Sequence, residues 1–311
     1  MKATSVTPAD LARSVVAVPP LCLTDDLGLA VEENRRLVRH VEAGGVSTIL
    51  WGGNAQMQHW PPSRYGELLE MAEATAGPDT WVIPAAGPDY GKLLDEAKAL
   101  AGKRFPAALM LPLAAHWTAE GIARGVRDFV QAAGMPALLY VRSRGYVRPD
   151  DLAAMVAAGE VVGVKYAVTV PDVRADPYLA DLVAAIGAER LVSGFGEPPA
   201  VAHIDAYRLA SFTAGCVCLV PRLSMAILAA LQRRAIADAT RLLAPILPME
   251  AIREKHSPIR VIHAAVALAG IARTGPLYPM LSQVEPALLP AIRAAADDLL
   301  AAEAALARAV A

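Results

Sequence analysis

The chain has 311 residues, of which 55% are apolar and only 5% aromatic, and its formal net charge is −2. This length is sufficient for one large α/β domain or two small ones, and the apolar fraction supports a large core. The nearly balanced charge gives no sign of a nucleic-acid partner.

Cysteine usage and the first residues indicate a reducing compartment. Cys22, Cys216 and Cys218 lie in or beside apolar runs, which is not the pattern of a disulfide framework. Residues 1–10 lack a basic segment followed by a long apolar stretch, and two prolines interrupt the apolar run 15–23. We therefore expect a cytoplasmic protein with neither a signal peptide nor a membrane span.

Eight short apolar runs alternate with segments of helical spacing. The runs are continuous rather than alternating, which is typical of parallel strands that are covered on both faces. The predicted strands are 14–18, 46–51, 81–85, 107–111, 137–140, 161–165, 190–194 and 213–220.

The segments between the runs have the punctuation of helices. Pro149, for example, opens a predicted helix with Asp150 and Asp151 in its first turn. Eight strand–helix units predict a TIM (β/α)8 barrel, with a doubly wound open sheet as the alternative.

After the eighth unit only helices are predicted, at 221–232, 235–247, 259–269 and 286–311. No low-complexity linker precedes them. We expect a barrel over residues 1–232 and a C-terminal helical extension over 233–311 that packs on the barrel.

Lys165 closes the sixth predicted strand, one strand–helix unit after Tyr140 closes the fifth. Taken singly, Lys165 could be a solvated lysine just past a strand end, and Tyr140 a strand residue whose hydroxyl bonds to a backbone carbonyl. Neighbouring barrel strands, however, place the two side chains together at one rim. A desolvated amine can attack a ketone to form an iminium, and a phenol beside it can transfer protons, which is Schiff-base lyase chemistry.

Five motifs carry a resemblance to a known family. They are Gly52-Gly53-Asn54-Ala55-Gln56 after the second predicted strand, Leu139-Tyr140 in the fifth, Val162-Gly163-Val164-Lys165 in the sixth, Ser193-Gly194 after the seventh, and Gly215-Cys216-Val217-Cys218 in the eighth. Together they resemble the dihydrodipicolinate synthase and N-acetylneuraminate lyase superfamily over nearly the whole chain. The resemblance implies a TIM barrel, usually a homotetramer, that acts on pyruvate or a larger 2-oxo acid through a lysine Schiff base. A dimer or a tetramer is therefore expected.

The local pattern is most similar to 5-dehydro-4-deoxyglucarate dehydratase, through Tyr140-Val141-Arg142 and the late segment 274–281. By this resemblance Lys165 is the iminium nucleophile and Tyr140 the proton relay. The resemblance also implies roles in substrate binding. Gly53 and Asn54 would hold the substrate carboxylate beside Gln56, Arg142 would clamp a distal carboxylate, and Ser193, Gly194 and Val217 would line the pocket.

Two departures from the family pattern bear on activity. Asn54 and Gln56 stand where family members usually have threonine and glutamate, and Leu113 and Ala114 occupy the region from which pyruvate-specific members lend a tyrosine to a neighbouring subunit. The departures make synthase activity on pyruvate plus aspartate semialdehyde doubtful. They also leave open an alternative in which the barrel binds a 2-oxo acid as a sensor or scaffold without turnover.

Metal and phosphate chemistry are the competing hypotheses. The six histidines are dispersed without a ligand spacing, and Cys216 and Cys218 in a strand would point in opposite directions. We therefore expect no cofactor and no required metal. Gly194-Phe195-Gly196-Glu197 could seat a phosphate near the seventh strand, but two glycines are a weak signal.

Overall fold

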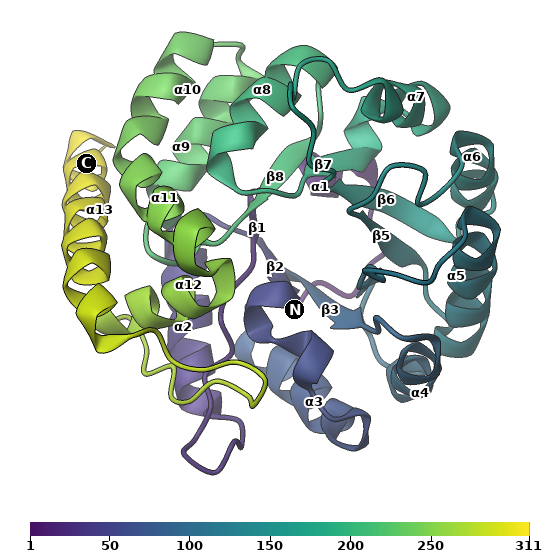
Figure 1. Ribbon diagram of the computed structural model, residues 1–311, viewed down its shortest axis with the longest axis horizontal. Helices are drawn as coiled ribbons and strands as arrows, with labels where there is room; N and C mark the ends of the chain where they lie inside the picture. Colours follow the sequence, from purple (N-terminus) through teal and green to yellow (C-terminus); the bar gives the residue numbers. More distant parts are fainter. Residues whose placement is uncertain (311) are drawn as a thin grey trace.

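The computed structural model describes residues 1–310, apart from the side chains of 309 and 310. Its centre is a closed barrel of eight parallel strands that neighbour one another in sequence order, so the predicted TIM barrel is confirmed (Figure 1). The strands are β1 Val16–Ala17, β2 Thr48–Trp51, β3 Trp81–Ala86, β4 Ala108–Met110, β5 Ala137–Val141, β6 Val161–Tyr166, β7 Leu191–Ser193 and β8 Ser211–Ala214. The open sheet is excluded, because β1 pairs with both β2 and β8.

A ring of helices surrounds the strands and buries their outer faces (Figure 1). These helices are α2 Val31–Ala43, α3 Tyr65–Thr75, α4 Tyr90–Leu100, α5 Ala119–Ala133, α6 Pro149–Ala157, α7 Pro177–Ile186, α8 Glu197–Tyr207 and α9 Pro221–Gln232. Side-chain caps fix two of their starts: Thr118 accepts a hydrogen bond from the Gly121 amide, and Asp176 accepts two, from the Tyr178 and Leu179 amides. Short 3-10 turns complete the connections at η1 Gly53–Ala55, η2 Met57–His59, η3 Pro62–Arg64, η4 Ala188–Arg190 and η5 Cys216–Cys218.

The bounds predicted for the eighth strand, 213–220, were wrong at both ends, because β8 covers Ser211–Ala214. The strand ends at Ala214, and the three residues Cys216–Cys218 form the 3-10 turn η5, in which the Cys218 amide donates to the Gly215 carbonyl. The chain turns here because Pro221 must already begin α9. The expected strand alternation of the two cysteines therefore does not exist.

Four helices follow the barrel. They are α10 Ile236–Leu243, α11 Leu247–His256, α12 Pro258–Leu268 and α13 Leu289–Val310, with the turns η6 Ala244–Ile246 and η7 Pro286–Leu288. Two of these helices, α11 and α12, lie at the carboxyl ends of the strands. α11 had no counterpart among the predicted segments, and the last residue of the predicted helix 286–311 lies outside the described residues. α12 packs against η1, and α13 packs against α9 and α12. The division of the chain at residue 232 stays a prediction.

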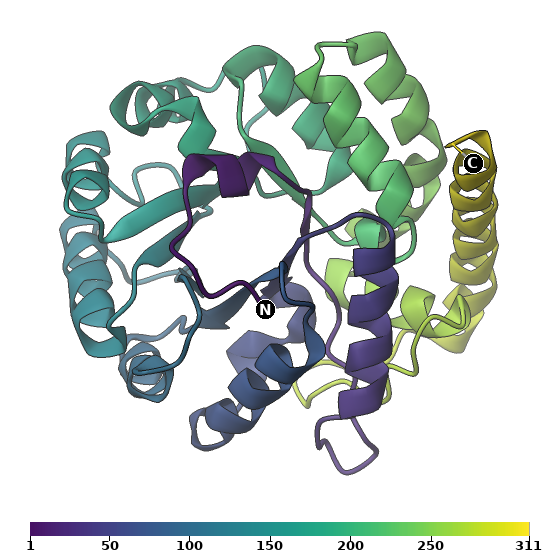
Figure 2. The same cartoon turned by 180° about the vertical axis from the view of Figure 1, so that it is seen from behind.

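The opposite end of the barrel is closed by the start of the chain. Figure 2 shows the N-terminal segment with α1, Pro8–Ala12, crossing this end. Leu11 of α1 is buried and packs directly on β6 at Gly163. A methyl group added at Gly163 would lie only 2.9 Å from the Leu11 side chain. Ligands therefore reach the barrel from its carboxyl end. Within the described part of the chain, no helix combines the length and the apolar character that crossing a bilayer requires.

Candidate active site

A cavity of about 380 Å³ opens at the carboxyl end of the barrel. Six of the predicted site residues line it: Gly53, Asn54, Tyr140, Arg142, Lys165 and Gly194. They come from the ends of β2, β5, β6 and β7, which is where parallel barrel strands deliver reactive groups.

Lys165 and Tyr140 lie directly opposite each other in the β5–β6 ladder. Lys165 is only 6% exposed, so it is not a solvated surface lysine. Its Nζ donates a hydrogen bond to the Gly194 carbonyl at 3.2 Å and lies 3.7 Å from the centroid of the Tyr140 ring. The amine is thus held inside the cavity, against the aromatic ring that carries the expected proton-transferring hydroxyl.

The electrostatics of the pair favour proton transfer by the phenol. Burial raises the pKa of Tyr140, but the charge of Lys165 and polar contact with it, helped by Arg142, lower that pKa to a net value below the ordinary one for tyrosine. A phenol with a lowered pKa ionises more readily near neutral pH. It is therefore better suited to accept and return a proton than a free tyrosine is.

The turn η1 presents backbone donors at another part of the cavity wall. Gly53 and Asn54 are its first two residues, so their amides have no partner within the turn, and they make no other backbone hydrogen bond among the described residues. The Asn54 side chain reaches across to the residue that follows β1 and donates from Nδ2 to the Val18 carbonyl at 2.8 Å. The turn is thereby fixed to the barrel while its amides stay free for an anionic group such as a carboxylate.

Positive charge dominates the cavity lining. Arg142 and Arg253 line it together with Lys165, and no Asp or Glu of the described chain is among the lining residues. Arg253 is 6% exposed and donates from Nε to the Pro258 carbonyl at 3.3 Å. A methyl group at Gly215 would lie 2.5 Å from Nη2 of Arg253, so the guanidinium packs over this glycine. The lining therefore favours an anionic ligand.

Three predicted site residues lie outside the cavity wall, each fully buried and engaged elsewhere. Gln56 accepts a hydrogen bond from the Tyr278 amide at 2.8 Å through Oε1, which ties the end of η1 to the C-terminal region. The Ser193 hydroxyl pairs with Nδ1 of His203 at 2.8 Å. Val217 is buried in η5. These positions support the cavity wall and do not face the ligand space.

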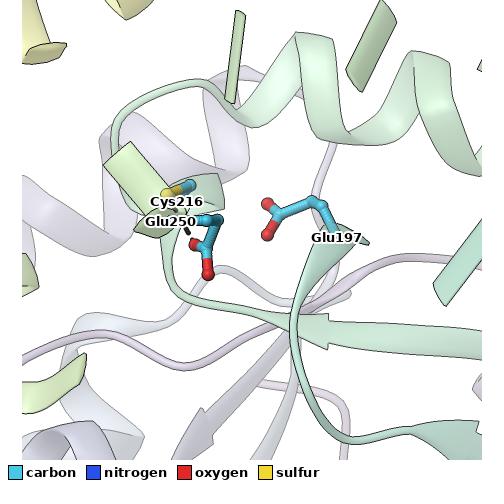
Figure 3. Close-up of side chains that lie close together, drawn as sticks. All are labelled: Glu197, Cys216 and Glu250. Carbon is cyan, nitrogen blue, oxygen red and sulfur yellow. Dashed lines mark hydrogen bonds between the residues drawn. The ribbon is translucent and has the colours of Figure 1, made fainter. Parts of the chain in front are cut away.

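A cluster of ionisable groups beside the cavity, most of them buried, was not predicted. Glu197, Cys216 and Glu250 come from α8, η5 and α11 (Figure 3). Arg253 pairs with Glu250. Burial and the nearby Glu250 charge raise the pKa of Glu197 to about 8, against the opposing effect of Arg253. Burial likewise raises the pKa of the Cys216 thiol. The cluster also argues against a phosphate site at Gly194-Phe195-Gly196-Glu197. The Glu197 carboxyl lies in the first turn of α8, where the phosphate would have to bind.

Comparison with known proteins places the fold. No family model matches the sequence, and no curated protein is significantly similar to it. Among solved structures, dihydrodipicolinate synthase from Bacillus clausii is 20% identical, with 94% of this chain and 98% of that chain covered and a TM-score of 0.76. The Agrobacterium tumefaciens synthase is 16% identical, with 94% and 99% covered and a TM-score of 0.81. The sialic acid aldolase of Ruminococcus gnavus is also 16% identical, with 94% and 99% covered and a TM-score of 0.79. The chain therefore has the fold that these synthases and this aldolase share, as the sequence resemblance implied.

Proposed function

We propose that this protein is a Schiff-base-forming lyase, an aldolase or a dehydratase, that acts on pyruvate or a sugar-derived 2-oxo acid. The observation that carries the proposal is the pairing of a buried amine, Nζ of Lys165, with the Tyr140 ring in a cavity lined by positive groups. Proteins of the same fold are named as synthases and an aldolase, which supports the lyase class.

The chemistry begins when the neutral Lys165 amine attacks the ketone carbon of the substrate. The resulting carbinolamine loses water, and the C=N bond of the iminium replaces the C=O bond. Tyr140 transfers the protons that this exchange of oxygen for nitrogen requires, and its lowered pKa suits that role. The iminium then accepts the electron pair of the bond that breaks next, which gives an enamine.

The remaining lining groups orient the substrate. The free amides of Gly53 and Asn54 would bind the carboxylate next to the ketone. Arg142 is exposed at the rim and forms no ion pair within the described chain, so it is available for a distal carboxylate. The oligomeric state, a tetramer or a dimer by resemblance, is a separate expectation that analytical ultracentrifugation measures.

Reduction with borohydride tests the proposal. Incubation with pyruvate or a larger 2-oxo acid, followed by reduction, should leave one covalent adduct that peptide mass spectrometry assigns to Lys165. Lys165→Ala should abolish the adduct, while Lys98→Ala, at an exposed position on α4, should retain it. Failure to trap an adduct with any 2-oxo acid would reject the iminium mechanism.

The alternative function is a catalytically silent barrel that binds a 2-oxo acid. Its basis is the presence of Asn54 and Gln56 where threonine and glutamate are usual in the resembling family. An adduct on Lys165 without turnover of any aldol or dehydration substrate would favour this alternative. Turnover that disappears in Lys165→Ala would exclude it.

A further inference from the structure

A group of three metal-ligating side chains, two of them buried and one partly exposed, lies directly behind the cavity wall. The Cys216 thiol donates to Oε1 of Glu250 at 2.9 Å. One ligand atom each from Glu197, Cys216 and Glu250 lies within 4.8 Å of the other two. A methyl group at Gly196, which lines the cavity, would be 3.5 Å from Oε2 of Glu250. The group is therefore adjacent to the substrate space without being part of its lining.

One oxygen of this group lacks a partner. Glu197 is fully buried, and its Oε1 accepts a hydrogen bond from the Ser224 hydroxyl at 3.0 Å. Its Oε2 is also buried but has no hydrogen-bond partner among the described residues. Figure 3 shows the Glu197 carboxylate directed toward Cys216 and Glu250. A buried carboxylate oxygen without a partner is costly, so something else is expected to satisfy it.

We propose that Glu197, Cys216 and Glu250 bind a divalent transition-metal ion of the zinc type. A tetrahedral ion with Zn–O distances of about 2.0 to 2.2 Å and a Zn–S distance of about 2.3 Å needs donor atoms roughly 3.5 Å apart. One ligand atom from each of the three residues lies within 4.8 Å of the other two, so rotations of the side chains would close the remaining gap. A thiolate among the donors selects zinc, cobalt or cadmium over magnesium and calcium.

The neighbouring Arg253 is compatible with such an ion. Its Nη1 contacts Oε1 of Glu250, which leaves Oε2 of that carboxylate for coordination. Two carboxylates and one thiolate carry three negative charges, and a dication together with the guanidinium neutralises them. The thiol proton, and the proton that Glu197 keeps because its pKa is raised, pass to solvent when the ion binds. Arg253 would then be an outer partner of a ligating carboxylate, as is common in metal sites.

The proposed site goes beyond the Schiff-base chemistry, which needs no metal. Because Arg253 lines the cavity and pairs with Glu250, the ion would hold one wall of the substrate space in place. Entry is possible from the side of Glu250, whose side chain is 14% exposed.

Cobalt is the probe for the test, because a thiolate bound to Co²⁺ produces a ligand-to-metal charge-transfer band in the near ultraviolet. Protein treated with a chelator and then titrated with Co²⁺ should develop this band at one equivalent, and Zn²⁺ should displace the Co²⁺. Cys216→Ser should lose the band. Cys218→Ser, a matched control two residues away in the same buried turn, should retain it.

Glu197→Gln tests the site with the thiol intact and should weaken Co²⁺ binding by at least about tenfold, since even outer-shell losses cost that much. Circular dichroism checks that each variant is folded. A wild-type protein that shows no charge-transfer band would overturn the proposal, as would a band that survives in Cys216→Ser. Lys165→Ala should bind Co²⁺ like the wild type, so a failure of the Schiff-base mechanism is distinguishable from a failure of the metal site.

Discussion

Replacing Tyr140 by phenylalanine isolates the role of its hydroxyl. Nζ of Lys165 lies 3.7 Å from the ring centroid, so the phenylalanine variant keeps the cation–π contact and the packing that shelter the amine. Only the proton-transferring group is removed. The loss of a positioned general acid–base costs about 10²- to 10⁴-fold in rate, or about 3 to 5 kcal/mol of activation free energy.

The assay is the rate at which the Lys165 adduct with pyruvate forms, measured by quenching with borohydride at timed intervals. In the wild type the rate should rise with pH for two reasons: the Lys165 amine must be neutral to attack, and the phenol, whose pKa Lys165 lowers, becomes the base as it ionises. The phenylalanine variant should keep only the rise that belongs to the amine, and it should be slower than the wild type by the factor given above. Its free energy of unfolding should lie within about 1 kcal/mol of the wild-type value, since one hydroxyl contributes little to stability.

A wild-type rate of adduct formation in Tyr140→Phe would refute the proton-relay role. Tyr146→Phe is a suitable control. That hydroxyl accepts a hydrogen bond from the Leu113 amide at 3.0 Å and does not line the cavity, so its removal should leave the rate unchanged.

Three further substitutions test the packing around the site. Gly163→Ala should lower the free energy of unfolding in urea by about 1 to 3 kcal/mol, because the new methyl group would lie 2.6 Å from the Arg190 carbonyl. Gly66→Ala is the control, since a methyl group there meets no atom within 4 Å, and it should raise the free energy of unfolding by about 0.4 to 1 kcal/mol. Equal effects of the two substitutions would contradict the packing argument. Burial lowers the pKa of His203 to about 4, so the unfolded state takes up a proton that the folded state refuses as the pH falls from about 6.5 to about 4. The free energy of unfolding of the wild type, relative to that of His203→Asn, should therefore fall by about 3 kcal/mol between pH 6.5 and pH 4 in urea titrations. If the difference between the two proteins does not change with pH, the ring does not stay neutral in the folded state. Gly215→Ala should displace the Arg253 guanidinium, because the new methyl group would occupy its place. The 2-oxo acid concentration for half-maximal trapping should then rise about tenfold, which corresponds to the loss of one charge-assisted hydrogen bond. An unchanged concentration would exclude Arg253 from substrate binding.

The sequence was sufficient to predict the barrel and the contact between Tyr140 and Lys165, because both depend on local patterns. Continuous apolar runs identify buried parallel strands, and closure of the barrel sets neighbouring strands side by side. Tyr140 and Lys165 each end such a run, so their contact follows from the order of the strands. The end of β8 was predicted wrongly because residues 216–220 are as apolar as a strand, although hydrogen bonds from Cys218 and Leu219 to carbonyls three residues earlier close a turn.

The residues that were missed are those whose position depends on how the C-terminal helices return to the barrel. Glu250 and Arg253 lie three residues apart on α11, where a pair of opposite charges is usually a solvated helix face. Only the packing of α11 and α12 over the barrel rim brings Arg253 to the cavity. No local signal in the sequence distinguishes such a helix from one that covers the outside of the molecule.

The placement of Asn54 and Gln56 bears on whether their departure from the family pattern must abolish catalysis. In this structure both side chains hold the turn η1, since Asn54 is bonded to the Val18 carbonyl of the β1 region and Gln56 to the Tyr278 amide of the C-terminal region. The groups expected to bind the substrate carboxylate are backbone amides, which any residue provides. An amide side chain that fixes the turn can therefore stand in place of a hydroxyl or a carboxylate, provided that the turn keeps its geometry. The amine, the phenol and the free backbone donors are all present, so Asn54 and Gln56 do not by themselves argue against the proposed turnover.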